Sequence, residues 1–137
     1  MSVICILLLM LCIAQGKNDA KIYTEDVLEK YETNETTHKL KVKKGDKFAI
    51  QLRSNPTTGY IWKLVNRDEL NLLTPASKDG RGLFIPPIVE EGVMGAPGIE
   101  QYFFTPKEKG VEMVELEYKR EWENHPLVVY KILIFSE

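Results

Sequence analysis

Cysteine and histidine are scarce in this chain of 137 residues. Its two cysteines, Cys5 and Cys12, lie in the apolar segment at its start, and its two histidines are His38 and His125. Beyond that segment there is no thiol for a nucleophile or for a disulfide framework. Two isolated histidines without cysteine partners make a poor zinc site, and a serine triad needs a histidine held by a carboxylate. We therefore expect no enzyme, no metal and no cofactor, and we interpret both histidines as solvent-facing.

A large excess of charge of one sign is also lacking. The formal net charge is −2, and no basic stripe is interleaved with aromatic residues, which argues against nucleic acid as a partner. No glycine-rich phosphate loop is present. The carboxylate pair Glu90-Glu91 does not suggest acid–base chemistry, because adjacent residues of a strand point to opposite faces.

Long hydrophobic runs are limited to residues 3–13. That run is shorter than the roughly 20 residues that span a bilayer, and Ala14-Gln15-Gly16 places small residues where a signal peptidase cuts. We interpret residues 1–16 as a secretory signal peptide cleaved before Lys17, although no lysine or arginine precedes the run. The alternative is an uncleaved membrane anchor. Cleavage predicts no stable membrane insertion and delivery to the extracellular space or to lysosomal or phagosomal vesicles.

Residues 17–137 contain no repeat, linker or low-complexity tract, so we expect one domain, which we interpret as a monomer. Without disulfides, packing alone must stabilise it. Asn34-Glu35-Thr36 fits the N-glycosylation sequon and lies in a polar stretch.

Alternation of apolar and polar residues predicts short strands. Residues 37–52 are interpreted as a β-hairpin turning at Lys44-Gly45-Asp46, and residues 68–73 as one helical turn. Trp62 falls on the apolar face of its strand and is predicted to lie in the core. The other strands are expected at 60–64, 83–85, 99–105, 112–118 and 127–135, the last being the most apolar and central. Such strands predict an all-β, immunoglobulin-like β-sandwich.

Three connections of this predicted sandwich have unusual sequences. They are Asn55-Pro56-Thr57-Thr58-Gly59, Gly95-Ala96-Pro97-Gly98 and residues 120–126. They correspond to the B–C, D–E and F–G loops, which we expect at one end of the domain, where this architecture carries its binding loops.

The first loop is stiff. Proline fixes φ near about −65°, the two threonines are restricted at χ1, and Gly59 can supply a positive φ. A loop that has already lost its conformational freedom loses less entropy on binding. Taken alone, the same string also fits an ordinary tight connection between strands.

Trp122 stands out in the third loop, because it lies in a charged segment outside any apolar periodicity. Tryptophan and arginine are the residues most enriched at interface hot spots. One interpretation is therefore a binding anchor, and the other is a lid folded over the end of the sandwich.

The three loops together resemble those of the chagasin family, inhibitors of papain-like cysteine peptidases, and in particular its amoebiasin-like branch. The first motif, N-P-T-T-G-Y-x-W, is complete. In the second, Pro97 replaces a glycine of the G-x-G-G pattern, which changes the backbone path. In the third, Tyr118-Lys119-Arg120-Glu121-Trp122, Glu121 replaces the proline of R-P-W and adds a charge beside Arg120 that could form an ion pair.

The resemblance implies a three-loop wedge that blocks the active-site cleft of a papain-like peptidase. It implies that Thr57 and Thr58 lie over the catalytic thiol, that the second loop follows the non-primed side, and that Trp122 packs on the primed side. The peptidase-binding residues it implies are Asn55, Pro56, Thr57, Thr58, Gly59, Tyr60, Gly95, Ala96, Pro97, Gly98, Arg120, Glu121 and Trp122. The alternative function is an immunoglobulin-like adhesion or carbohydrate-recognition module using the same end.

Overall fold

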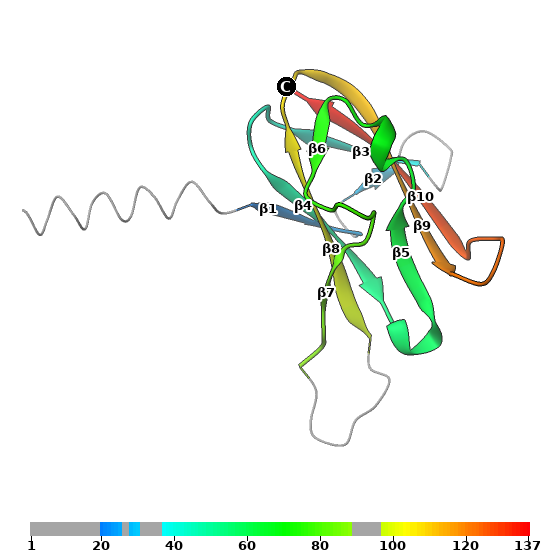
Figure 1. The fold of residues 1–137 in the computed structure, drawn as a ribbon. Coiled ribbons are helices and arrows are strands. Elements are labelled where there is room, and N and C mark those ends of the chain that lie inside the picture. Colours follow the sequence, from blue (N-terminus) through cyan, green and yellow to red (C-terminus); the bar gives the residue numbers. More distant parts are fainter. Residues whose placement is uncertain (1–19, 26–27, 31–36, 89–96) are drawn as a thin grey trace, which may run out of the picture.

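The structure, a computed structural model, describes residues 20–25, 28–30, 37–88 and 97–137. These residues form two sheets packed face to face (Figure 1). The predicted signal peptide, the Asn34 sequon and the Glu90-Glu91 pair lie outside the described residues. Within those ranges, no helix has the length and apolar character needed to cross a membrane.

The first sheet has the order β1-β4-β8-β6, and β7 also pairs with β8. Its strands are β1 (Lys21–Thr24), β4 (Phe48–Ser54), β6 (Leu73–Pro75), β7 (Leu83–Ile85) and β8 (Gly98–Pro106). The second sheet has the order β2-β3-β10-β9-β5. Its strands are β2 (Glu29–Lys30), β3 (Thr37–Val42), β5 (Tyr60–Leu64), β9 (Gly110–Arg120) and β10 (Val128–Ser136). Two 3-10 turns, η2 (Pro56–Thr58) and η3 (Arg67–Glu69), complete the described elements.

The prediction of an immunoglobulin-like β-sandwich is confirmed. Strands β5, β7, β8, β9 and β10 fall where the alternation placed them, and β10 is the central strand of its sheet. The helical turn expected over 68–73 is instead η3, which starts at Arg67 and ends at Glu69. The short strands β1, β2 and β6 have too few alternating residues to be found from sequence.

The prediction of a hairpin over residues 37–52 is wrong. The turn exists, with a φ of 86° at Gly45 and a bond from the Asp46 N–H to the Lys43 carbonyl (3.1 Å). However, β3 pairs in parallel with β10, whereas β4 pairs with β1 and β8 in the other sheet. Alternation shows which face of a strand is buried but not which strand is its neighbour, so the same pattern fits both arrangements.

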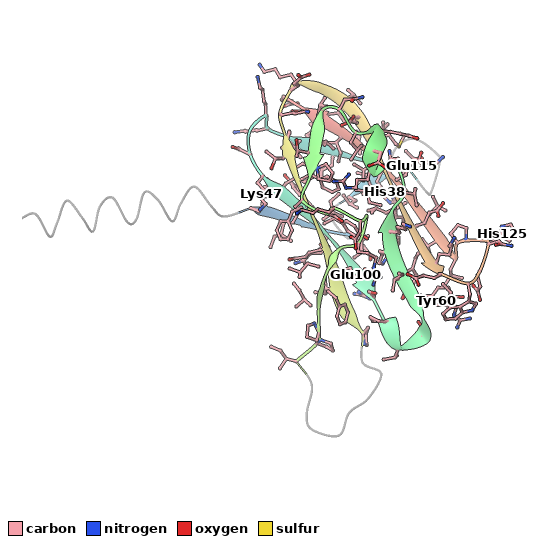
Figure 2. The ribbon with its side chains drawn as sticks, in the orientation of Figure 1. His38, Lys47, Tyr60, Glu100, Glu115 and His125 are labelled. Atoms are coloured by element: carbon pink, nitrogen blue, oxygen red, sulfur yellow. The ribbon has the colours of Figure 1, made fainter. Side chains whose placement is uncertain are left out.

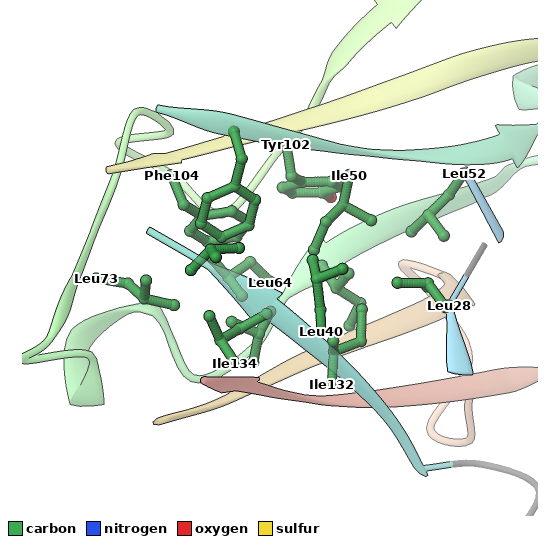
Figure 3. Packing of buried hydrophobic residues seen from close by; sticks show 14 of the residues in the cluster. Leu28, Leu40, Ile50, Leu52, Leu64, Leu73, Tyr102, Phe104, Ile132 and Ile134 are labelled. Carbon is green, nitrogen blue, oxygen red and sulfur yellow. The ribbon is translucent and has the colours of Figure 1, made fainter. Parts of the chain in front are cut away.

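The core fills the space between the two sheets (Figure 3). Both sheets contribute inward residues, such as Ile50 and Leu52 from β4 and Ile132 and Ile134 from β10. Trp62 is 3% exposed, which confirms its predicted place in the core.

The interpretation of His38 as solvent-facing is wrong. Its side chain is buried and meets the Tyr130 ring edge-on, with ring centroids 5.2 Å apart. The period of two along β3 places His38 on the same inward face as Leu40 and Val42. Figure 2 shows His38 within the sandwich, whereas His125 is exposed on the β9–β10 connection, as expected.

Candidate functional site

The β4–β5 connection is a single 3-10 turn with its own network of hydrogen bonds. The Asn55 carbonyl accepts bonds from the Thr58 N–H (3.1 Å) and the Thr58 hydroxyl (2.7 Å). The Thr57 hydroxyl donates to Oδ1 of Asn55 (2.5 Å), and the Gly59 N–H donates to the Pro56 carbonyl (2.9 Å). Gly59 ends the turn with a φ of 85°, a conformation that glycine adopts without steric cost. The turn thus satisfies several of its own polar groups, and Pro56, Thr57 and Thr58 are exposed.

Hydrogen bonds from residues of the second sheet fix this turn in place. The Asn55 N–H donates to the Tyr118 hydroxyl (3.1 Å), and Nε of Arg120 donates to the Thr58 carbonyl (2.9 Å). Just before the turn, Nε1 of Trp62 donates to the Arg53 carbonyl (2.8 Å). The turn is therefore fixed at its entry, its first residue and its last residue, and it is preorganised for binding.

Arg120 connects the first and third loops. Its guanidinium lies over the Tyr60 ring, 4.3 Å from the centroid, and 5.8 Å from the centroid of Trp122. Its Nη1 donates to Oε1 of Glu123 at 3.1 Å. Stacked and charge-assisted contacts of this kind use the flat guanidinium, which lysine cannot replace.

Among the described residues, no ion pair joins Arg120 to Glu121, although the sequence suggested that one could form. Arg120 pairs with Glu123 instead, and Glu121 lies 3.8 Å from Nη1 of Arg81. A residue three positions on comes back beside Arg120 because the chain turns here, as shown by the bond from the Glu123 N–H to the Arg120 carbonyl (3.1 Å). Both pairs are partly exposed, so each contributes only about 0–1 kcal/mol.

Trp122 is 71% exposed, which argues against its interpretation as a lid over the sandwich. One edge of its indole rests on Gly59, where a Cβ atom would stand 2.5 Å from Cη2 of Trp122. The remaining surface of the ring is free to contact a partner. A large, rigid aromatic presented in this way has the character of an interface hot spot.

A column of aromatic rings runs from the base of the loops into the core. Tyr60 packs on Tyr118 with centroids 5.3 Å apart, and Tyr118 stacks on Trp62 at 4.9 Å. Trp62 stacks on Tyr130 at 5.3 Å, and Tyr130 reaches His38. Burial, followed by the nearby charge of Glu25, raises the pKa of Tyr130 above its ordinary value. The column gives the first and third loops a rigid base.

The second loop is described only at its end. Gly95 and Ala96 lie outside the described residues, whereas Pro97 is exposed and Gly98 is the buried first residue of β8. Gly98 lies opposite Ser54 in the β4–β8 ladder, so the second loop ends beside the start of the first. A Cβ atom on Gly98 would stand 2.5 Å from the Ile85 carbonyl oxygen and 2.7 Å from the Phe84 ring. Gly98 is therefore required for close packing.

Three supporting residues were missed at the sequence level as parts of the site. Tyr118 was named only as the first residue of the third motif, and Glu123 only as part of the loop at residues 120–126. Glu100 is 3% exposed, and its Oε2 accepts the Trp62 N–H at 3.0 Å across the two sheets. Figure 2 shows Glu100 at the level of β5, the edge strand that it secures. Only the three-residue spacing of Arg120 and Glu123 could have been noticed beforehand.

The described loops offer surfaces for contact rather than catalytic groups. No cluster of three or more histidine, cysteine or acidic side chains suited to a metal occurs in the part of the chain that the structure describes. The first and third loops are in direct contact at Gly59, and β4–β8 pairing brings the end of the second loop beside the first. Figure 1 shows the end of β4 and the start of β5, which flank the first loop, near the start of β8.

Comparison with known proteins agrees with this geometry. The profile of the chagasin family peptidase inhibitors, family I42, matches residues 41–134. Chagasin of Trypanosoma cruzi is 34% identical over 87 residues, covering 61% of this chain and 73% of chagasin. Amoebiasin-2 of Entamoeba histolytica is 30% identical over 112 residues, covering 79% of this chain and 84% of amoebiasin-2.

Solved structures share the fold. The crystal structure of the cysteine protease inhibitor EhICP2 from Entamoeba histolytica matches with a TM-score of 0.63 and 24% identity, covering 86% of this chain and 96% of that one. PbICP-C, solved in complex with falcipain-2, matches with a TM-score of 0.53 and 17% identity, covering 85% and 98%. The chain therefore belongs to the chagasin family of peptidase inhibitors, and it is an inhibitor rather than an enzyme.

Proposed function

We propose that this chain inhibits papain-like cysteine peptidases reversibly and competitively, by placing its three loops in the active-site cleft as a wedge. The observation that carries the proposal is the first loop, whose tip is exposed while Tyr118 and Arg120 fix its backbone. Its relatives are named as peptidase inhibitors, and PbICP-C has been solved with falcipain-2 bound.

The shape of the first loop disfavours cleavage of the inhibitor by the peptidase. The chain at Pro56–Thr58 is a 3-10 turn. A peptidase cleaves an extended segment whose carbonyl is placed for attack, and a closed turn does not present its carbonyls in that way. The Thr58 carbonyl, moreover, already accepts a bond from Arg120. The wedge therefore excludes substrate without forming an acyl-enzyme.

The role proposed for each loop is the one that the resemblance to the chagasin family implies. Thr57 and Thr58 would lie over the catalytic thiol, the second loop would follow the non-primed side, and Trp122 would pack on the primed side. An interface of about 800 Å² on each partner with one aromatic anchor is compatible with nanomolar affinity, about −12 kcal/mol.

The test is a titration of the purified chain against active papain with a fluorogenic peptide substrate. We expect the apparent KM to rise, kcat to stay constant and activity to return on dilution. A papain variant whose catalytic cysteine is replaced by alanine should still bind. Loss of binding to that variant would mean covalent trapping. Binding to immobilised glycans without inhibition would instead favour the adhesion or carbohydrate-recognition module.

We also propose that residues 1–16 direct the chain into the secretory pathway, and that residues 17–137 form the inhibitor found outside the cell or in lysosomal or phagosomal vesicles. The apolar run at residues 3–13 and the small residues Ala14 and Gly16 that follow it support this proposal. Expression in a eukaryotic host followed by N-terminal sequencing of the secreted product tests it. We expect the first residue to be Lys17, and an intact N-terminus retained with membranes would contradict it.

A further inference from the structure

An exposed apolar surface adjoins the second loop. Four large hydrophobic side chains lie within six residues there, at exposed fractions of 59% for Leu83, 39% for Phe84, 37% for Ile85 and 105% for Ile88. The other exposed large hydrophobic residues of the described ranges are spread over distant segments, apart from Trp122 in the third loop and Leu127 directly after that loop. Single exposed hydrophobic residues are normal, but a group gathered in one segment often marks an interaction site. Along β7 the side chains alternate, so Leu83 and Ile85 share one face, whereas Phe84 lies on the other, where its ring packs on Gly98. We call Leu83, Phe84, Ile85 and Ile88 the apolar shoulder.

The apolar shoulder is continuous with the wedge. The Phe84 ring and the Ile85 carbonyl pack directly on Gly98, at the end of the second loop. Gly98 pairs with Ser54, the residue before the first loop, and the first loop meets Trp122 at Gly59. These contacts form a row that links the shoulder, the end of the second loop, the first loop and Trp122 in that order. The row has an apolar group at each end. Figure 1 shows β7 running towards this same end of the molecule.

The backbone of the shoulder argues against pairing with another strand. Strand β7 has three residues, and Pro86 and Pro87 follow it directly. Proline has no N–H to donate, and prolines and short lengths are the usual means of protecting a sheet edge from strand addition. A second copy of this chain would therefore find little backbone to pair with. The shoulder is suited to side-chain contact with an apolar surface.

We propose that the apolar shoulder contacts the peptidase directly, on an apolar part of the surface that flanks the non-primed end of its cleft. This inference rests on the proposed function and extends the peptidase contact beyond the three loops. The first loop carries a polar tip in the middle of the row, while Trp122 and the shoulder are separated apolar anchors on either side. Two separated anchors restrict rotation of the inhibitor about its first loop in the complex. The shoulder therefore acts mainly by slowing dissociation of the inhibitor from the peptidase.

The test compares three variants of the full chain with the unmodified chain. Ile88→Asp and Ile85→Ser change exposed shoulder residues. Val111→Asp is the matched control, because Val111 is 56% exposed and lies at the start of β9, away from the Arg120 end that enters the third loop. Inhibition constants and dissociation rates for papain are measured, together with thermal unfolding and the sedimentation coefficient of each free chain.

We expect Ile88→Asp and Ile85→Ser to raise the inhibition constant about 5- to 20-fold, mostly through faster dissociation, and Val111→Asp to change it less than about twofold. Unchanged inhibition by both shoulder variants, with the unmodified chain still potent, would overturn this inference and leave the proposed function intact. An unmodified chain that does not inhibit at all would overturn both. A free chain that sediments as a dimer, and becomes a monomer on Ile88→Asp, would assign the shoulder to a second copy instead.

Discussion

The indole of Trp122 rests on Gly59, so closely that a methyl group at Gly59 would stand 2.5 Å from Cη2 of Trp122. The two residues belong to different loops and are 63 positions apart in the sequence. Gly59 also has a φ of 85°, which an L-amino acid with a side chain adopts only at a cost. One glycine therefore fixes both the end of the first loop and the position of the anchor in the third.

Replacing Gly59 by alanine should damage inhibition far more than one methyl group suggests. The positive φ costs about 1–2 kcal/mol in alanine, and the new Cβ must displace the Trp122 ring. We expect the inhibition constant to rise at least about tenfold. Gly45→Ala is the matched control, because Gly45 has a φ of 86° and no atom within 4 Å of its Cβ position. It should lower the free energy of unfolding similarly and leave inhibition unchanged. Equal losses of inhibition in both variants would show that strain alone is responsible.

The two tryptophans should behave in opposite ways. Trp122→Ala removes an exposed ring and should weaken inhibition by about 2–4 kcal/mol with little change in thermal stability. Trp62→Ala removes a ring that stacks on Tyr118 and Tyr130, and it should cost about 3–5 kcal/mol of folding free energy. Inhibition assays and calorimetry on both variants provide the check. If Trp122→Ala unfolds the domain, Trp122 is a structural residue and the third loop has no anchor.

The fold was largely predictable from sequence because alternation reports burial. It placed Trp62 in the core and β10 at the centre of a sheet. It could not assign partners, so the segment that crosses from β3 to β4 was taken for a hairpin. The misplacement of His38 has a different cause. The polar character of histidine was given more weight than its position in the strand. The same alternation that buries Leu40 also turns His38 inwards.

The features of the site that depend on a short stretch of sequence were predictable. Those that depend on the pairing of strands were not. The stiffness of residues 55–59 follows from their residue types alone. The supports from Tyr118 and Arg120 depend on β5 pairing with β9, with Tyr60 opposite Arg120, which no local pattern reveals. The same holds for the exchange of ion partners by Arg120 and Glu121, because the turn after β9 decides which carboxylate comes back beside which guanidinium.

Arg120→Lys should weaken inhibition about tenfold although it keeps the charge. Lysine cannot make the flat stack on Tyr60 and at the same time donate sideways to the Thr58 carbonyl. The first loop then loses one of its supports, and more entropy is lost on binding. The control is Arg81→Lys, which affects only the exposed pair with Glu121 and should change the inhibition constant less than about twofold. Loss of inhibition in 0.5 M salt by the unmodified chain would point to the charge, not the stack, as the important feature.

The size of the side chain at Thr57 should decide whether the tip enters a cleft. Thr57 is exposed and its hydroxyl bonds Oδ1 of Asn55, so Thr57→Ala removes one bond and leaves the path of the backbone set by Asn55, Thr58 and Gly59. We expect it to raise the inhibition constant only about three- to tenfold, the effect of one modest hydrogen bond. Thr57→Tyr keeps a hydroxyl and adds a ring that the exposed position tolerates in the free domain, so thermal stability should not change. In a narrow cleft the same ring meets the floor, and inhibition should be lost. Inhibition constants for both variants against papain, with unfolding temperatures for each, separate the two effects. A Thr57→Tyr variant as potent as the unmodified chain would show that the first loop binds outside the cleft.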